Sequence, residues 1–287
     1  MSLPTSPTTS LDGLGPGPSP EAVALALSRS GAPDIAWLDS SLEEGARWSV
    51  VAAWPDRTLT SHRGGPDPFP RLRELVRETP APAAPLPAAH LILAAGYDLG
   101  ARFDRFPTRA FDDLQEPDLR LRRYPAILIY DHRRQAWWFS ALSADARREG
   151  AGRYFRILPE NVPPPPPPGA PAPGPLRRNL GRDAYLAAVR EAKRLITEGE
   201  IYQVNLAQRF QVPTTEDPLQ VYRRLRRLSP APYAAFIAAS GEPALERGCG
   251  DGDPLLQLRA SGLDVEGLDS SSDMLETKSS NSGYLPK

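Results

Sequence analysis

The sequence predicts an α+β fold in which antiparallel sheets pack face to face as a sandwich and helices lie on the outside. Three stretches carry this prediction. Residues 182–197 place apolar side chains at helical spacing, namely Tyr185, Val189, Ala192 and Ile196. After Gly199, residues 201–212 alternate apolar and polar side chains, which is typical of a strand with one solvated face. Apolar runs on both sides of the polar segment 131–134 predict a β-hairpin.

The same rules predict the remaining elements. Further helices are expected at 22–27, 68–78 and 218–228, the last with Asp217 as its N-cap. In the helix at 68–78, three side chains are expected to point inward: Leu72, Leu75 and Val76. Strands are expected at 35–38, 47–53, 58–61, 91–98, 125–130, 135–140 and 233–239. The strand at 91–98 is predicted to be buried.

Four arginines surround the apolar stripe of the helix at 218–228: Arg223, Arg224, Arg226 and Arg227. An anion or nucleic-acid patch would explain them, but a solvated helix face is the preferred interpretation. The chain of 287 residues has 34 basic and 35 acidic side chains, so its formal net charge is −1. This balance gives no electrostatic reason to expect a nucleic-acid or membrane partner.

Composition also indicates a compartment and a linker. The single cysteine, Cys249, allows no internal disulfide, and no apolar run is long enough to span a bilayer, so a cytoplasmic protein is expected. Residues 1–20 resemble no secretory signal and are expected to form a disordered leader. Proline contributes 34 residues, and residues 159–178 are predicted to be a Pro-rich linker. A docking ligand for an aromatic groove is the alternative interpretation of this linker.

The sequence offers no candidate metal site. Its histidines are His62, His90 and His132, and none has a partner at the spacing of metal ligands. No Ser/His/Asp constellation for nucleophilic catalysis is apparent either. Each histidine is therefore expected at a turn or on the surface.

Two runs resemble the chorismate-binding enzymes, the large subunits of anthranilate synthase and aminodeoxychorismate synthase. They are EGEIYQVNLAQRF and DPLQVYRRLRRLSPAPYAAF. The resemblance is closer to aminodeoxychorismate synthase component I. It implies amination of chorismate to 4-amino-4-deoxychorismate in the folate and p-aminobenzoate pathway. It also implies ammonia from a glutamine amidotransferase partner and magnesium bound with the substrate. Anthranilate synthase component I is the alternative, and its reaction would add pyruvate elimination.

A second part of the resemblance concerns a tryptophan site. The segments WLDSS and ARWSVVAAWP are similar to an N-terminal hairpin that lines a tryptophan pocket in many members of the family. The residues that the resemblance assigns to tryptophan binding are Ser40, Arg47, Ser49, Asn205, Pro232 and Tyr233. Hydroxyl and amide groups can hold an amino-acid head group, and a proline–aromatic wall can face an indole. Alternatively, these side chains only close the sandwich.

The resemblance ends near Gly241. Residues 21–158 correspond to the family's N-terminal region, and residues 179–241 to the start of an incomplete chorismate-binding domain. The family's catalytic residues and magnesium ligands fall in the part that would follow, so none is assigned here. The chain is therefore expected to be truncated and inactive alone. A non-catalytic tryptophan-binding module is a further alternative.

The tail suggests a different family. Residues 242–276 resemble the first βαβ unit of class I methyltransferases, which bind S-adenosylmethionine. That resemblance assigns cofactor binding to Gly248, Gly250, Gly252 and Asp269. A methyltransferase fragment is thus another alternative, and the junction suggests a composite or frameshifted reading frame. Residues 277–287 are expected to be disordered.

Overall fold

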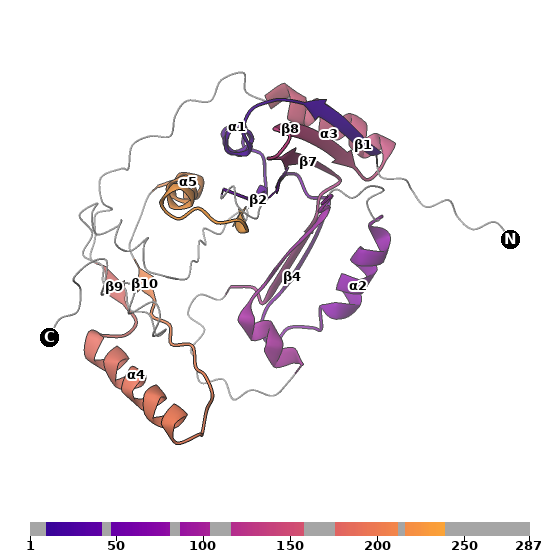
Figure 1. Ribbon diagram of the computed structural model, residues 1–287. Helices are drawn as coiled ribbons and strands as arrows, with labels where there is room; N and C mark the ends of the chain where they lie inside the picture. Colours follow the sequence, from indigo (N-terminus) through magenta and orange to yellow (C-terminus); the bar gives the residue numbers. More distant parts are fainter. Residues whose placement is uncertain are drawn as a thin grey trace. The chain divides into compact units, whose positions relative to one another are not determined.

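The computed structural model describes residues 10–41, 47–80, 87–103, 116–157, 176–211 and 216–238 (Figure 1). The chain divides into two compact units. The first unit comprises Met1–Pro164 and Pro230–Leu245, and the second comprises Pro165–Ser229 and Glu246–Lys287. The described residues 230–238 therefore group with the N-terminal region, whereas the sequence analysis placed them in the segment 179–241.

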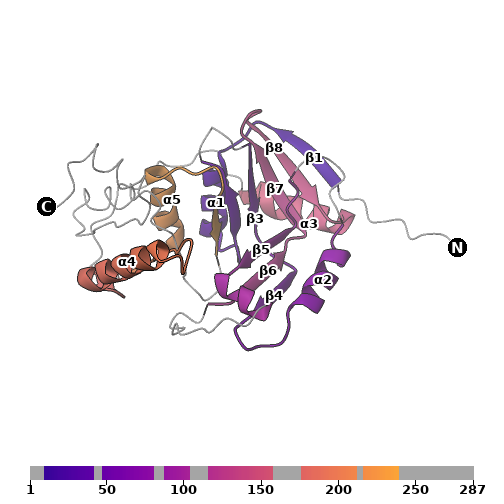
Figure 2. The same cartoon turned by 60° about the horizontal axis from the view of Figure 1, so that its bottom comes forward.

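An antiparallel sheet of six described strands forms the centre of the first unit, in the order β1-β8-β7-β3-β2-β11. Figure 2 shows β1, β8, β7 and β3 side by side. The strands are β1 (Ser10–Gly15), β2 (Ala36–Asp39), β3 (Trp48–Ala52), β7 (Ala126–Asp131), β8 (Ala136–Ala141) and β11 (Ala234–Ile237). Mixed helices and antiparallel sheets confirm the predicted fold class.

The predicted hairpin at 131–134 is present as the turn between β7 and β8, where Gln135 adopts a φ of 50°. Side chains alternate between the two faces of the sheet, because successive residues of a strand point in opposite directions. Val51, Leu128 and Phe139 are buried on the face that α1 (Pro20–Arg29) and α3 (Ala144–Ile157) cover.

Helix α3 lies very close to this sheet. A Cβ atom added at Gly150 would come within 2.4 Å of the Ala126 Cβ atom, so only glycine fits without movement. One turn further along, the buried Tyr154 hydroxyl donates to the Ala126 carbonyl at 3.1 Å and accepts the Ala53 amide at 3.0 Å. The hydroxyl thereby satisfies two backbone groups that would otherwise be buried without partners.

A three-stranded sheet in the order β4-β6-β5 completes the first unit. Its strands are β4 (Arg57–Ser61), β6 (Leu119–Arg123) and β5 (Leu91–Ala95), and α2 (Phe69–Glu78) packs on one face through Leu75. The 3-10 helix η1 (Tyr97–Arg102) follows β5. Ile92 joins the core cluster on the other face of the six-stranded sheet, so the two sheets share one core.

Several expectations for this unit are wrong in detail. Residues 10–15 lie within the expected disordered leader but form β1, because β8 offers them an open edge for backbone hydrogen bonds. The strand predicted at 91–98 ends at Ala95 and is mostly exposed; only Ile92 of β5 is buried. Val76 is 53% exposed, since Leu75 takes the inward position of α2.

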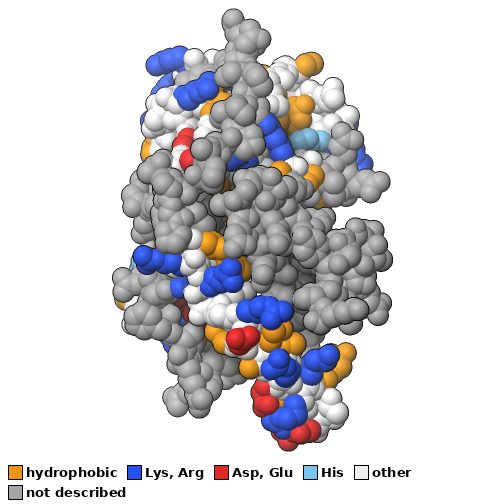
Figure 3. All heavy atoms as spheres, turned by 90° about the vertical axis from the view of Figure 1, so that its left-hand side faces the viewer, with side chains coloured by type: hydrophobic (Ala, Val, Ile, Leu, Met, Phe, Trp, Pro, Cys, Tyr) orange, Lys and Arg blue, Asp and Glu red, His pale blue; other side chains and the backbone are white. Residues whose placement is uncertain are grey.

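The second unit contains α4 (Arg182–Thr197) and α5 (Pro218–Leu228), with a short pair of strands, β9 (Arg177–Arg178) and β10 (Phe210–Gln211). Gly199 ends the α4 region with a φ of 78°, as predicted. Figure 3 shows acidic and basic side chains intermixed at the lower end of the view, where α4 lies. Arg194 pairs there with Glu191 at 2.6 Å and also with Glu198.

The strand predicted at 201–212 is largely absent, since only residues 210–211 are in a described strand. A strand needs a neighbour for its backbone groups, and among the described residues β9 pairs with only two of its positions. Tyr202 is accordingly 95% exposed. The interpretation of the α5 arginines as a solvated helix face is wrong for Arg223. This side chain is 2% exposed and donates to the Gln220 side chain at 2.8 Å.

Candidate functional site

The candidate site is a polar cluster at one end of the six-stranded sheet. It forms where β2 ends, β3 begins, β7 ends and the chain enters β11. Antiparallel pairing aligns these points, because Leu38 lies opposite Val50 and Trp48 lies opposite Asp131. Ala234 in turn lies opposite Asp39. Segments nearly 200 residues apart in the sequence thus meet at one place.

Ser40 is at the centre of this cluster and is 8% exposed. Its amide N–H donates to the Ser49 hydroxyl at 3.1 Å. Its own hydroxyl lies 2.7 Å from the Trp48 carbonyl oxygen and 2.8 Å from the Pro232 carbonyl oxygen, and its single proton can serve one of them at a time. The structure therefore brings three of the expected site residues together: Ser40, Ser49 and Pro232.

The neighbouring Ser41 strengthens the same junction. Its amide N–H donates to the Ala231 carbonyl at 3.1 Å, and its hydroxyl accepts the Ala231 amide N–H at 3.1 Å. The loop before β11 is thus fixed to the end of β2 by backbone and side-chain bonds. Because the loop is already ordered, it can contact a ligand without the entropy cost of ordering a loop on binding.

Arg47 forms an ion pair with Asp131, a carboxylate of this cluster. Its Nη2 donates to the Asp131 Oδ2 at 2.8 Å, and its guanidinium lies 4.3 Å from the centre of the Trp48 ring. Asp131 is fully buried, which alone would raise its pKa. The hydrogen bond from Arg47 and those from the backbone N–H groups of Arg134 and Arg133 outweigh burial and lower the Asp131 pKa. Asp131 is therefore a carboxylate that organises the turn after β7.

His132 completes the cluster, and the sequence placed no function on it. Its Nε2 lies 2.8 Å from the Ser49 hydroxyl, and its backbone N–H donates to the Arg47 carbonyl at 2.9 Å. The ring meets Tyr130 edge-on, with 4.9 Å between ring centres. No sequence pattern marks His132, because its position depends on the pairing of β7 with the distant strand β3, which brings the end of β7 beside the start of β3.

Two further residues expected at the site, Tyr233 and Asn205, are both exposed. Tyr233 follows Pro232 but is 85% exposed, so its ring faces outward. Asn205 belongs to the second unit and is exposed. The tail positions assigned to S-adenosylmethionine, Gly248, Gly250, Gly252 and Asp269, lie outside the described residues, and their role stays a prediction.

His90 contradicts the expectation that each histidine lies at a turn or on the surface. It is 2% exposed; its Nδ1 lies 2.7 Å from the Tyr124 carbonyl oxygen and its Nε2 lies 2.9 Å from the Ser140 hydroxyl. A carbonyl only accepts, so Nδ1 carries the proton and Nε2 accepts from the serine. Burial lowers the His90 pKa, although the bond to the carbonyl opposes this. The imidazole joins the segment between β6 and β7 to Ser140 of β8.

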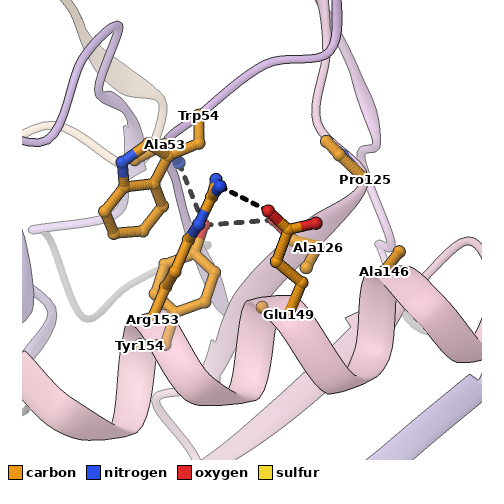
Figure 4. A pocket seen from close by; sticks show the side chains of 9 residues that line it. Ala53, Trp54, Pro125, Ala126, Ala146, Glu149, Arg153 and Tyr154 are labelled. Carbon is orange, nitrogen blue, oxygen red and sulfur yellow. Dashed lines mark hydrogen bonds and ion pairs between the residues drawn. The ribbon is translucent and has the colours of Figure 1, made fainter.

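A small cavity, half open to solvent, lies elsewhere in the first unit and has a volume of about 30 Å³. Figure 4 shows, among the residues that line it, the Tyr154 hydroxyl bonded to backbone groups of Ala53 and Ala126, and Arg153 paired with Glu149. The Arg153 guanidinium also lies 5.4 Å from the centre of the Trp54 ring. The cavity is far smaller than a pocket for a metabolite.

Within the described part of the chain, no three His, Cys, Asp or Glu side chains gather closely enough to hold a metal ion. The resemblance places the family's magnesium ligands in the part that would follow residue 241, and no step through magnesium is derived from the described residues. No described helix has the length and apolar character needed to cross a membrane.

Comparisons with known proteins bear on these observations. The sequence model described as chorismate binding enzyme matches residues 35–245. The chain belongs to the chorismate-binding enzyme family. It is 31% identical over 231 residues to aminodeoxychorismate synthase component 1 of Klebsiella aerogenes, covering 72% of this chain and 49% of that protein. Anthranilate synthase component 1 of Thermus thermophilus is 29% identical over 219 residues, covering 71% and 47%.

A solved structure agrees on the fold. Anthranilate synthase component I of Streptococcus pneumoniae superposes with a TM-score of 0.54 at 21% identity, covering 66% of this chain and 47% of that one. At this identity the likeness concerns the fold alone. The chain spans about half the length of the relatives it matches.

Proposed function

We propose that this chorismate-binding family member acts as part of component I of aminodeoxychorismate synthase. That enzyme aminates chorismate to 4-amino-4-deoxychorismate on the route to p-aminobenzoate and folate. The observation that carries the proposal is the 31% identity over 231 residues to the Klebsiella aerogenes protein of that name. Ammonia would reach the reaction from a glutamine amidotransferase partner, and chorismate would be bound with magnesium. The groups for those steps are not assigned to any described residue.

We further propose that the polar cluster around Ser40 belongs to a tryptophan-binding site. Two features support this use. Hydrogen bonds from Ser40 and Ser41 fix the loop 231–232, so this side of the proposed site is ordered before a ligand binds. Aromatic surface is close by, because Trp48 is half-buried at the start of β3 and the Tyr233 ring is exposed after Pro232. An amino acid with an indole side chain matches a site that joins polar and aromatic surfaces.

Within this proposal we give Arg47 a different role from the one that the resemblance assigns. A free arginine would be an obvious partner for the carboxylate of an amino acid. Here the bond to Asp131 raises the Arg47 pKa and holds the guanidinium at the turn after β7. We therefore assign Arg47 to the frame of the site.

Anthranilate synthase component I is the second candidate. The relative from Thermus thermophilus, at 29% identity over a similar length, favours it nearly as strongly. The two reactions share chorismate and ammonia and differ in the ring position aminated and in pyruvate loss. The described residues build the sheets, the helices and the polar cluster around Ser40. They do not distinguish aminodeoxychorismate synthesis from anthranilate synthesis.

Gene deletion in the source organism tests the proposal. If the chain serves aminodeoxychorismate synthesis, the deletion strain will require p-aminobenzoate and will grow without added tryptophan. A requirement for tryptophan that p-aminobenzoate does not relieve would favour anthranilate synthesis. Unchanged growth without either supplement would contradict both assignments. Restoring the gene as it stands is the control, because it links the requirement to this chain.

A further inference from the structure

A chain of hydrogen bonds runs from the β7–β8 turn to the loop before β11. His132 Nε2 lies 2.8 Å from the Ser49 hydroxyl, the Ser49 hydroxyl accepts the Ser40 amide N–H at 3.1 Å, and the Ser40 hydroxyl lies 2.8 Å from the Pro232 carbonyl oxygen. Its two ends are about a hundred residues apart in the sequence. We propose that His132 is a positioning residue of the tryptophan site and acts through Ser49 on Ser40. This inference rests on the proposed tryptophan site.

Burial separates the residues that position from those that can touch a ligand. Ser49 is 1% exposed, so its hydroxyl is surrounded by protein and does not face a ligand. Ser40 is 8% exposed and adjoins the loop at Pro232. The sequence assigned Ser49 to tryptophan binding itself. The geometry instead makes Ser49 the link between an imidazole and the backbone that shapes the site.

The imidazole is well placed to hold this link, because its position is fixed independently of Ser49. The backbone N–H of His132 donates to the Arg47 carbonyl at 2.9 Å, which fixes the backbone of the turn. The Tyr130 ring stands at 89° to the imidazole plane, which fixes the side-chain rotation. Arg133 and Arg134 donate their backbone N–H groups to the buried Asp131 carboxylate, which closes the turn around the histidine.

The Ser49 oxygen can satisfy both of its neighbours at once. A hydroxyl has one proton and two lone pairs. One lone pair accepts the Ser40 N–H, and the proton or the second lone pair remains for His132 Nε2. Without the imidazole, the Ser49 hydroxyl is free to rotate about its side-chain bond. The Ser40 N–H would then lose its fixed acceptor. The Ser40 hydroxyl would no longer be held at one distance from the Pro232 carbonyl oxygen.

Paired substitutions separate positioning from simple packing. His132→Phe keeps an aromatic ring against Tyr130 and removes the bond to Ser49, whereas His132→Gln removes the ring and keeps a group that can reach the serine. Ser49→Ala removes the same bond from the other side. His62→Phe provides the matched control at an exposed histidine.

Calorimetric titration of L-tryptophan into each full-length variant is the first readout. The second is the amide signal of Ser40 in ligand-free protein labelled with ¹⁵N-serine. Loss of one hydrogen bond corresponds to a change of about fivefold to tenfold in affinity. We expect this weakening for His132→Phe and Ser49→Ala, with a shifted Ser40 amide signal. His132→Gln and the control should stay within about twofold of the parent.

The opposite pattern would overturn the inference. If His132→Phe binds tryptophan as the parent does, or if His132→Gln weakens binding as much as His132→Phe, the hydrogen bond does not position the site. Absence of tryptophan binding by the parent chain is a separate result, which rejects the proposed tryptophan site itself. The Ser40 amide signal still reports in that case whether His132 controls the Ser40 backbone.

Discussion

Two glycines of α3 provide a sharp test of how this helix packs on the sheet. Gly150 faces β7 and β8, where an added Cβ would meet the Ala126 Cβ of β7 at 2.4 Å and the Phe139 ring of β8 at 3.1 Å. Gly152 lies on the same helix, and a Cβ there would meet nothing within 4 Å. Alanine at either position should gain about 1 kcal/mol of helix propensity. Only the alanine at position 150 must also displace the helix.

Overpacking of a buried contact typically costs about 1–3 kcal/mol. Gly152→Ala should therefore raise the free energy of unfolding by about 0.5–1 kcal/mol. Gly150→Ala should lower it by up to about 2 kcal/mol, because the overpacking cost exceeds the propensity gain. The free energies of unfolding of the two variants should therefore differ by about 1–3 kcal/mol. This difference measures how closely α3 packs on the sheet at Gly150.

Urea unfolding monitored by tryptophan fluorescence measures this difference. All five tryptophans of the sequence lie within the first unit, so the signal reports on the unit that contains α3. The variants should share the denaturant slope of the parent and differ in midpoint. Equal stability of Gly150→Ala and Gly152→Ala would refute the close packing of α3 on β7.

Three further predictions follow from single contacts. Tyr154→Phe should lower the stability of the first unit by about 1–3 kcal/mol in urea unfolding, because two buried backbone groups lose their partner; a change below about 0.5 kcal/mol would contradict this. The lowered His90 pKa means that the unfolded chain binds a proton more readily, so stability should fall as pH drops below about 6.5. Parallel pH profiles for the parent and His90→Gln would count against that account. Asp217→Ala should cost the second unit about 1 kcal/mol, measured by loss of far-ultraviolet circular dichroism on heating, because the Asp217 side chain accepts the Leu219 N–H at 2.9 Å. Asp217→Asn is its control and should keep most of that stability.

Local patterns predicted the elements whose stability depends on neighbours close in sequence. The hairpin at 131–134 was predictable because a polar turn between two apolar runs specifies its own partner strand. The N-cap at Asp217 was likewise predictable, since its acceptor and donor are two residues apart. Gly199 was predictable as the end of the α4 region because it adopts a positive φ, which glycine tolerates without steric cost.

Elements that depend on distant partners were not predictable in the same way. Residues 201–209 alternate like a strand, but alternation indicates only which side chains share a face and supplies no neighbouring backbone. Residues 10–15 lack a strand pattern yet form β1, because the edge of β8 supplies their partners.

The candidate site shows the same division. The resemblance placed Ser40, Ser49 and Pro232 together, and the structure joins them through hydrogen bonds. It did not indicate Asp131 or His132, whose contribution depends on the register between β3 and β7. A histidine in a polar turn has no distinguishing sequence pattern, so its contact with Ser49 becomes apparent only in the fold.

The most direct test of the central claim is calorimetric titration of L-tryptophan into the purified full-length chain, with L-phenylalanine titrated in parallel. If the polar cluster belongs to a tryptophan site, tryptophan will bind saturably at one site per chain, and phenylalanine will bind more weakly because it lacks the indole N–H. Ser40→Ala should weaken tryptophan binding, since it removes the bond that fixes the loop at Pro232. No heat of binding and no rise in melting temperature at millimolar tryptophan would contradict the claim.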